Sequence, residues 1–435
     1  MFGSRVKFDT AVFFICCCIV QIFGKDTVKY AAVIFRHGQR TPVKPYPTDP
    51  YRNESLWPVK FGELTNTGKM QHYALGQWLR TRYADLISEQ FDPSEVYVRS
   101  TDYDRTLMSA QANLAGLFPP TGKSVWNKKL DWQPIPIHSE PLAEDCTLYM
   151  GKPCKAYDDE LKRYRESKEY KKSLYEYQKL MNYLSAYTGE TVTDYEKIEY
   201  LYSNLYIETL FNFTLPNWTQ SVFPDEMAGP AAHSFKIPTG TPLLARLRAG
   251  PLLQQIVSHM EKVVKSENST IKLSIYSAHD DTVGFVLNAL SLFDDRCPVF
   301  TATVLLELVY DDISRQYSIQ ISYRNSTEIV EPNLLSIPYC GEKCELERFK
   351  KLYHNLLGVN WEVDCNNKSA EWSDSTVFYI FGILLILVIF GMREYTNVSR
   401  IFEYSLVTKA SDMTNTSTPH KSKSATETEN LATII

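Results

Sequence analysis

Residues 28–42, VKYAAVIFRHGQRTP, pass from an apolar run into a polar loop. The run at 28–35 is short and rich in apolar and β-branched side chains, which predicts a buried β-strand. Arg36, His37 and Arg40 follow it directly. Open α/β sheets bind ligands outside the carboxyl ends of their strands, so these side chains are expected to face a ligand. Arginine suits phosphate because its guanidinium donates paired hydrogen bonds to the oxygens.

Two further predicted strands end in a similar way. Residues 96–99 form a short apolar run that ends in Arg99, and residues 272–278 lead into His279 and Asp280. Taken alone, Arg99 suits a structural ion pair as well as a ligand. An aspartate at the start of a helix also serves as a cap. Together, however, the three strand ends form a coherent set of side chains for a phosphate pocket.

Helices are expected between these strands. The spacing of apolar residues predicts helices at 65–87, 104–117 and 282–292. Thr67 can cap the first of them. A late hairpin is predicted at 303–310 and 317–323. Strands that alternate with helices imply a parallel or mixed sheet covered on both faces. Residues 158–227 are dense in Tyr, Lys, Glu and Leu and contain no convincing strand, which predicts an inserted helical lobe.

Both ends of the chain differ from the middle. Residues 1–24 have basic side chains, then an apolar run and the small Gly24, which predicts a secretory signal peptide; an uncleaved anchor is the alternative. Residues 376–392 are uncharged and apolar over a length near the lower limit for a membrane-spanning helix. More basic residues follow this run than precede it. We therefore expect residues 393–435 to be a disordered cytoplasmic tail and residues 25–375 to lie outside the cytosol, as in a single-pass type I membrane protein.

Short motifs agree with an exported domain. Six Asn-x-Ser/Thr sequons are predicted to carry glycans, at Asn53, Asn212, Asn217, Asn268, Asn325 and Asn367. In the tail, Tyr395 and Tyr404 each begin a Tyr-x-x-apolar pattern of the kind that endocytic adaptors bind, and an incidental tyrosine is the alternative for each. The lysosomal or endosomal membrane and the cell surface are both expected locations. The net charge of −5 provides no overall basic field that would attract nucleic acid.

Four segments carry a resemblance to a known family. They are VIFRHGQRTP at 33–42, YVRSTDYDRTLMSA at 97–110, NFTLPNW at 212–218 and IYSAHDDTV at 275–283. Through them, nearly the whole predicted ectodomain resembles the histidine acid phosphatases, specifically their prostatic and lysosomal branch. The resemblance implies an α/β fold of the phosphoglycerate-mutase-like superfamily, a Rossmann-like three-layer sandwich with an inserted, mainly helical lobe. It also implies a metal-independent acid phosphatase that hydrolyses phosphate monoesters.

The same resemblance implies the roles of the site residues. His37 would be the nucleophile that becomes a phosphohistidine, and Asp280 would protonate the leaving alcohol. The substrate phosphate would be bound by Arg36, Arg40, Arg99 and His279. Three arginines can neutralise a phosphoryl group, so no metal and no cofactor are expected. A nucleophilic imidazole needs one unprotonated nitrogen in acid, so a hydrogen bond on the other nitrogen, or the substrate phosphate, must set its tautomer.

By resemblance, the disulfides are Cys154–Cys365 and Cys340–Cys344. The family's third bridge is missing, and whether Cys146 pairs with Cys297 stays open. A homodimer is implied by resemblance alone. One alternative function is a catalytically silent ectodomain that serves as a receptor. Another is a phosphatase specialised for inositol phosphates, lysophospholipids or phosphorylated glycans.

Overall fold

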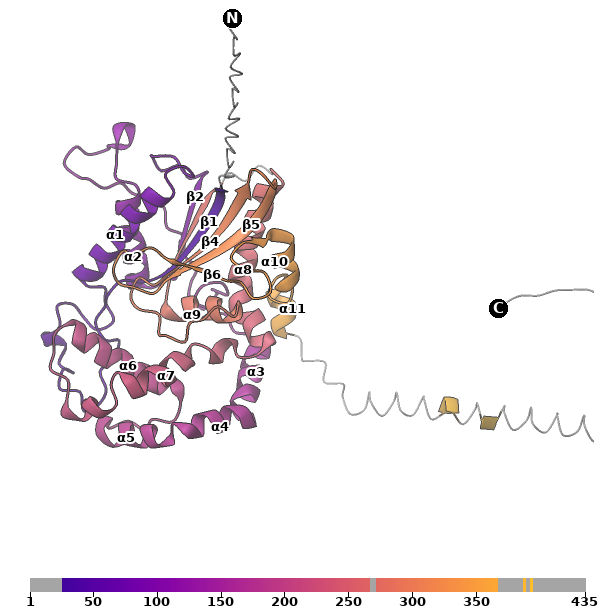
Figure 1. Cartoon of the computed structure of the whole chain (residues 1–435). Helices are drawn as coiled ribbons and strands as arrows, with labels where there is room; N and C mark the ends of the chain where they lie inside the picture. Colours follow the sequence, from indigo (N-terminus) through magenta and orange to yellow (C-terminus); the bar gives the residue numbers. More distant parts are fainter. Residues whose placement is uncertain (1–25, 267–270, 367–385, 389–391, 394–435) are drawn as a thin grey trace, which may run out of the picture. The chain divides into compact units, whose positions relative to one another are not determined.

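The computed structural model describes residues 26–266, 271–366, 386–388 and 392–393 (Figure 1). The chain divides into two compact units, Met1–Asn367 and Lys368–Ile435, and the first contains the sheet and the helices described below. The predicted signal peptide, most of the predicted membrane span and nearly all of the tail lie outside the described residues. The same is true of Asn268, Asn367, Tyr395 and Tyr404.

A mixed sheet forms the centre of the first unit. Its strands, in spatial order, are β2 (Val96–Ser100), β3 (Leu273–Ala278), β1 (Asp26–Arg36), β4 (Thr303–Asp311), β5 (Gln316–Arg324) and β6 (Asn333–Leu335). The short β7 (Cys344–Glu345) also pairs with β5. β1 and β2 both run parallel to β3, whereas β4, β5 and β6 join as antiparallel partners. The predicted mixed sheet and late hairpin are confirmed.

Helices cover both faces of this sheet, so the side chains of β1 are buried on both sides. Its alternate residues Ala31, Val33 and Phe35 pack with α1 (Asn66–Arg82) and α2 (Asp104–Leu117). The residues between them, Tyr30, Ala32 and Ile34, pack with α8 (Pro242–Val264), α9 (Asp280–Ala289) and α10 (Leu346–Leu352). Period-two alternation thus supplies two cores from one strand. Figure 1 shows the resulting three-layer sandwich, as predicted.

The ends of two helices differ from the prediction. Thr65, and not Thr67, caps α1: its backbone is extended, and its hydroxyl accepts a hydrogen bond from the Gly68 N–H at 3.1 Å. Thr67 lies inside the helix, where its backbone is already helical. α9 begins at Asp280, two residues before the predicted start, because the chain turns into the helix directly after His279. By contrast, α2 has the predicted bounds.

The inserted segment is helical, as predicted. It contains α3 (Lys155–Glu166), α4 (Lys168–Glu176), α5 (Gln178–Thr188), α6 (Tyr195–Leu210) and the start of α7 (Asp225–Ser234). These helices lie below the sandwich in Figure 1. They have a small core of their own, in which Leu184, Ile198 and Leu201 are completely buried. The lobe is therefore a packed element that can hold side chains in fixed positions next to the sheet.

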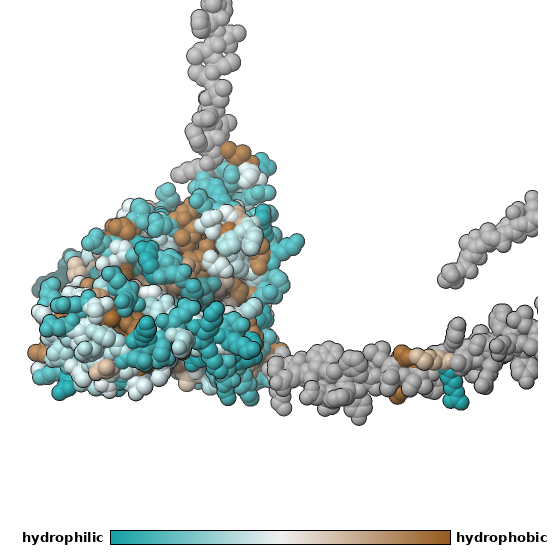
Figure 2. Space-filling model, turned by 60° about the horizontal axis from the view of Figure 1, so that its bottom comes forward, coloured by the Kyte–Doolittle hydropathy of each residue, from teal (hydrophilic) through white to brown (hydrophobic). Residues whose placement is uncertain are grey.

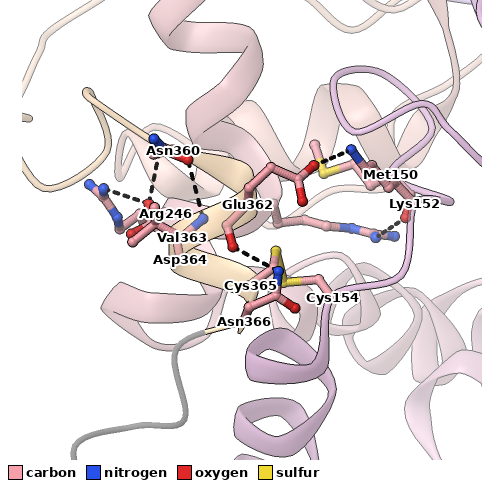
Figure 3. Close-up of a disulfide and its surroundings, with 11 residues drawn as sticks. Met150, Lys152, Cys154, Arg246, Asn360, Glu362, Val363, Asp364, Cys365 and Asn366 are labelled. Carbon is pink, nitrogen blue, oxygen red and sulfur yellow. Dashed lines mark hydrogen bonds and ion pairs between the residues drawn. A yellow bond between two sulfur atoms is a disulfide. The ribbon is translucent and has the colours of Figure 1, made fainter.

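The two disulfides match the predicted pairs. Cys154, just before α3, is bonded to Cys365 in α11 (Trp361–Asn366) (Figure 3). Beside this bond, Arg246 of α8 pairs with Asp364 at 2.7 Å. The other bridge joins Cys340 to Cys344. The Cys154–Cys365 bond therefore fastens the beginning of the lobe to α11, whereas the Cys340–Cys344 bond closes a local loop.

Neither Cys146 nor Cys297 takes part in a disulfide; both carry free thiols. The question that the sequence left open is therefore answered in this structure, where each cysteine lies partly buried and alone. The thiol of Cys297 faces a cavity that is described below.

Surface features bear on the other predictions from sequence. Asn53, Asn212 and Asn217 are exposed, whereas Asn325 is half-buried and its side-chain amide donates to the Cys297 carbonyl. On the face shown in Figure 2, apolar residues form patches separated by hydrophilic ones. Of the helices in the described part of the chain, none has the length and apolar composition that a membrane crossing requires.

The interior of the lobe contains a buried carboxyl group that makes the stability depend on pH. Glu208 of α6 is completely buried, and neither of its carboxylate oxygens has a hydrogen-bond partner among the described residues. Burial, reinforced by the nearby charge of Asp49, raises the pKa of Glu208 to about 8. A carboxyl group whose pKa is higher in the folded than in the unfolded state stabilises the fold in acid. That contribution is lost as the pH rises from the ordinary value of 4.5 towards 8.

We therefore predict that Glu208→Gln stabilises the protein at pH 7.5, by about 2 kcal/mol, and has little effect at pH 4.5. At pH 7.5 the folded protein must keep this carboxyl group largely protonated although it is ionised in the unfolded chain, and glutamine removes that cost; at pH 4.5 the cost is small for the wild type. Thermal unfolding of both proteins at the two pH values measures the difference. An equal shift of Tm at both values would contradict the prediction.

Candidate active site

Three strand ends meet at one edge of the sheet. β1 and β2 flank β3 in parallel, so their carboxyl ends lie side by side. Backbone hydrogen bonds continue past the strands: the His37 N–H donates to the Ala278 carbonyl at 3.0 Å, and the Thr101 N–H donates to the Ser277 carbonyl at 3.1 Å. The residues that follow the strands are therefore fixed by the sheet itself. This position agrees with the general placement of ligand sites in open α/β sheets.

His37 is held in one tautomer. Its Nδ1 lies 2.9 Å from the Gly38 carbonyl oxygen, which can only accept, so Nδ1 carries the proton and Nε2 is left with its lone pair. The side chain is almost completely buried. Burial, followed by the charges of Arg36, Arg105 and Arg40, lowers the pKa of His37 well below its usual range. The imidazole therefore stays neutral in acid and keeps a nucleophilic nitrogen.

Gly38 is required by close packing. A Cβ at this position would lie 2.3 Å from the backbone oxygen of Gly68, near the start of α1. The Gly38 N–H also donates to the Ser109 hydroxyl of α2 at 3.1 Å. The loop after β1 is thus clamped between the two helices on one face of the sheet.

Arg36 and Arg40 share an aromatic support. The guanidinium carbon of Arg36 lies 4.4 Å from the centre of the Phe300 ring, and that of Arg40 lies 6.0 Å from it. Phe300 is completely buried and also contacts His37, with ring centres 5.8 Å apart. Burial and the neighbouring charge of Arg36 lower the pKa of Arg40 to about 9, which still leaves it charged in acid. The ring therefore holds two cations beside one imidazole.

Arg99 has a different setting from the one the sequence suggested. Its guanidinium pairs with Asp145 at 3.0 Å and with Glu140 at 2.9 Å. Asp145 is completely buried and also accepts backbone hydrogen bonds from Thr147 and Leu148. Arg99 is thus an ion-pair partner in this structure, a setting that the sequence also allowed.

Arg105, in the first turn of α2, is the additional arginine that acts on His37. Its charge lowers the pKa of both His37 and His279, and it stacks over the Tyr103 ring at 4.5 Å. The Nε–H groups of Arg36, Arg40 and Arg105 are buried and have no partner among the described residues, and the same holds for Arg99. Sequence reasoning missed Arg105, although it stands in the segment 97–110 and opens a predicted helix.

His279 and Asp280 close the site from the end of β3. The ring of His279 lies 5.7 Å from that of His37, and its Nε2 is hydrogen-bonded to the Thr101 hydroxyl at 3.0 Å. Asp280 pairs with Arg36 at 2.7 Å. Burial lowers the pKa of His279 to about 3, helped by Arg105. Burial raises the pKa of Asp280, but Arg36 and Arg40 outweigh it, so the net pKa lies below its ordinary value.

Two cavities adjoin these residues. The smaller, of about 120 Å³, is lined by Arg40, Asp280 and Glu199 of α6. The larger, of about 330 Å³, is lined by Arg36, Glu199 and Tyr206, among others. Neither is lined by His37 itself, and both are lined partly by α6 of the helical lobe. Sequence reasoning also missed Glu199, because nothing local relates a residue of the insertion to the sheet edge.

This arrangement suits phosphoryl transfer. A tetrahedral anion can be neutralised by Arg36, Arg40 and Arg105 while the free Nε2 of His37 faces it. Asp280 is next to Arg36, where it can exchange a proton with an oxygen of the bound group. In the described part of the chain, no three His, Cys, Asp or Glu side chains are grouped as metal ligands.

Comparisons with known proteins agree with this geometry. The family model described as "Histidine phosphatase superfamily (branch 2)" matches residues 27–324. Human prostatic acid phosphatase is 37% identical over 363 residues, which cover 82% of this chain and 92% of the relative. Lysosomal acid phosphatase from Xenopus laevis is 34% identical over 386 residues, covering 86% and 89%. The phytase from Citrobacter braakii has a similar fold, with a TM-score of 0.57, 17% identity and coverage of 79% of this chain and 100% of that one.

The different settings of Arg105 and Arg99 lead to a paired prediction. Arg105→Gln is expected to weaken the binding of inorganic phosphate by about tenfold, since it removes one charged donor. Arg99→Gln should change phosphate affinity little but cost about 3 kcal/mol of stability, because it leaves the buried Asp145 carboxylate unpaired. Isothermal titration and thermal unfolding of the two variants test this. Loss of phosphate binding in Arg99→Gln alone would reverse the assignment.

Proposed function

This chain belongs to the histidine phosphatase superfamily (branch 2), and we propose that it is a metal-independent acid phosphatase that acts through a phosphohistidine on His37. One observation carries the proposal: the Gly38 carbonyl holds the Nδ1 proton of His37, and thus keeps Nε2 unprotonated among arginines. The similarity to prostatic and lysosomal acid phosphatases over most of the chain supports the hydrolysis of phosphate monoesters.

The first chemical step transfers the phosphoryl group to the protein. The Nε2 lone pair of His37 attacks phosphorus, a P–N bond forms, and the P–O bond to the alcohol breaks on the opposite side. Asp280 gives its proton to the departing oxygen. Arg36, Arg40 and Arg105 neutralise the phosphoryl oxygens throughout this step, and His279 contributes a further hydrogen bond.

The second step regenerates the site. Water attacks the phosphohistidine and gives a proton to the Asp280 carboxylate, the P–N bond breaks, and inorganic phosphate leaves. Asp280 is ionised in the empty site, because Arg36 and Arg40 lower its pKa. A substrate phosphate offsets those charges, so the pKa of Asp280 rises on binding and the group can take up the proton that it later donates. A free-site pKa below the ordinary value favours operation in acid.

The location and assembly are part of the proposal. The lysosomal acid phosphatases among the relatives support a lysosomal location. We further propose a signal peptide at 1–24, a lumenal or extracellular domain at 25–375 and a single-pass type I anchor at 376–392, on lysosomal or endosomal membranes or at the cell surface. Homodimerisation and adaptor binding through Tyr395 or Tyr404 complete the proposal. A catalytically silent ectodomain is not favoured, since His37 and Asp280 stand in a site equipped for phosphoryl transfer.

Substitution of the nucleophile tests the reaction. His37→Ala is expected to lower kcat/KM for 4-nitrophenyl phosphate at pH 5 by at least about 10³-fold, with a chelator present throughout. Quenching of the wild-type protein in alkaline detergent during turnover of a ³²P-labelled substrate should trap base-stable, acid-labile label on His37. Activity that the chelator abolishes, or that survives in His37→Ala, would overturn the proposal.

Substitution of the proton donor should depend on the leaving group. Asp280→Asn is expected to lower kcat/KM, which reports the first step alone, by about 100-fold for an alkyl phosphate and much less for 4-nitrophenyl phosphate, because nitrophenolate departs without protonation. The ratio of the two effects is measured in parallel assays at pH 5. An equal loss on both substrates would assign Asp280 to binding and not to proton donation.

A further inference from the structure

The larger cavity is placed to receive the organic part of a substrate. It shares Arg36 with the phosphate-binding set, and it shares Glu199 and Ser203 with the smaller cavity that Asp280 lines. When the ester oxygen contacts Asp280, the organic group attached to it can therefore extend from the phosphate position past Glu199 into the larger cavity. We refer to the two adjoining cavities, which share Glu199 and Ser203 of α6 as well as Phe235, as the track.

The walls of this cavity favour an aromatic group. Tyr202 and Tyr206 of α6 and Phe235 after α7 line it, with Pro298 and Val299 from the segment before β4. Its volume of about 330 Å³ accommodates a single ring with a short side chain. Aromatic walls offer stacking and also attract cations through the ring faces.

Glu199 supplies a carboxyl group that the protein leaves unpaired. The other charged lining residues are matched: Arg36 with Asp280 at 2.7 Å, Arg296 with Asp294 at 2.6 Å and Asp295 with Lys236 at 2.7 Å. Glu199 makes no hydrogen bond or ion pair with any residue in the described ranges. An unpaired carboxyl group between aromatic walls fits a ligand that brings its own positive charge.

We propose that this cavity binds the leaving group of the substrate, and that Glu199 makes it prefer aryl phosphates whose ring carries an ammonium group over those that carry a carboxylate or further phosphates. The proposal rests on the proposed phosphatase activity and names the substrate class of that site. It also separates this chain from enzymes for polyphosphorylated cyclitols, whose leaving groups carry several negative charges that Glu199 repels.

The preference depends on pH. Burial and the charges of Asp280 and Asp281 raise the pKa of Glu199 to about 8, while Arg36 and Arg40 oppose this rise. The thiol of Cys297, whose own pKa is raised by burial and by Glu199, also faces the carboxyl group and stays neutral. Glu199 thus becomes more negative as the pH rises towards 8, and a bound ammonium group favours that charged form. Discrimination between cationic and anionic leaving groups should grow with pH.

Three substrates of matched shape test the proposal on the full-length protein. They are tyramine O-phosphate, 4-ethylphenyl phosphate and the O-phosphate of 3-(4-hydroxyphenyl)propionate, which differ in the charge at the end of the side chain. The ratio of kcat/KM for the cationic over the anionic substrate is expected to rise by about fivefold between pH 5.5 and pH 7.5. In Glu199→Gln the ratio should stay constant with pH.

A control variant isolates the cavity. Glu196→Gln makes the same change one turn earlier on α6, where Glu196 pairs with Arg165 outside the cavity, and should keep the wild-type dependence on pH. Hydrolysis of the neutral substrate with a ratio that does not change with pH in the wild type would overturn this inference and leave the proposed function intact. Failure to hydrolyse any of the three substrates would overturn both. The wild-type comparison decides the matter even if Glu199→Gln does not fold.

Discussion

The site depends on keeping several positive charges together beside one neutral imidazole. Arg36, Arg40 and Arg105 repel one another, and burial lowers the pKa of both Arg40 and Arg105. The ion pair between Arg36 and Asp280 and the face of Phe300 offset part of this cost. Buried Nε–H groups remain without partners among the described residues. The positive charges of such a site are not fully compensated until an anion binds. Folding has already placed them, so phosphate binds without a further cost of arranging them.

The hydrogen-bonded backbone of the sheet makes this arrangement possible. It also separates the groups on the sheet from the cavity-lining residues of the lobe. The parallel ladder of β1, β3 and β2 continues through hydrogen bonds of His37 and Thr101, so the phosphate-binding groups stand on the sheet. The lobe contributes α6, whose residues line the cavities next to the phosphate position. In the proposed reaction, the sandwich thus supplies the reacting groups and the lobe receives the leaving group. A change within the lobe can alter substrate choice without disturbing the nucleophile.

The parts of the structure that could be predicted from sequence are those with a local signal. The strand before His37, the helix α2 and the hairpin of β4 and β5 follow from apolar periodicity and turn residues. The sequence could not decide which of Arg99 and Arg105 faces the site. Asp145, the partner of Arg99, lies 46 residues away from it, and the contact appears only in three dimensions. Glu199 comes from an insertion whose position relative to the sheet no pattern encodes. Long-range ion pairs and cavities therefore mark the limit of the sequence argument.

Acidic pH favours both the folded state and the proposed reaction, and it does so through several groups. His37 keeps its nucleophilic nitrogen, because burial and the arginines hold its pKa far below the usual range. Glu208 and Glu199 both have a pKa of about 8, so acid removes one unpartnered buried charge from the lobe and another from the track beside the phosphate position. The first effect stabilises the fold, and the second reduces repulsion of an incoming phosphate. Protonation of these two groups thus favours the same conditions as protonation of Asp280 in the proposed reaction, so an acidic preference is distributed over the fold and the site.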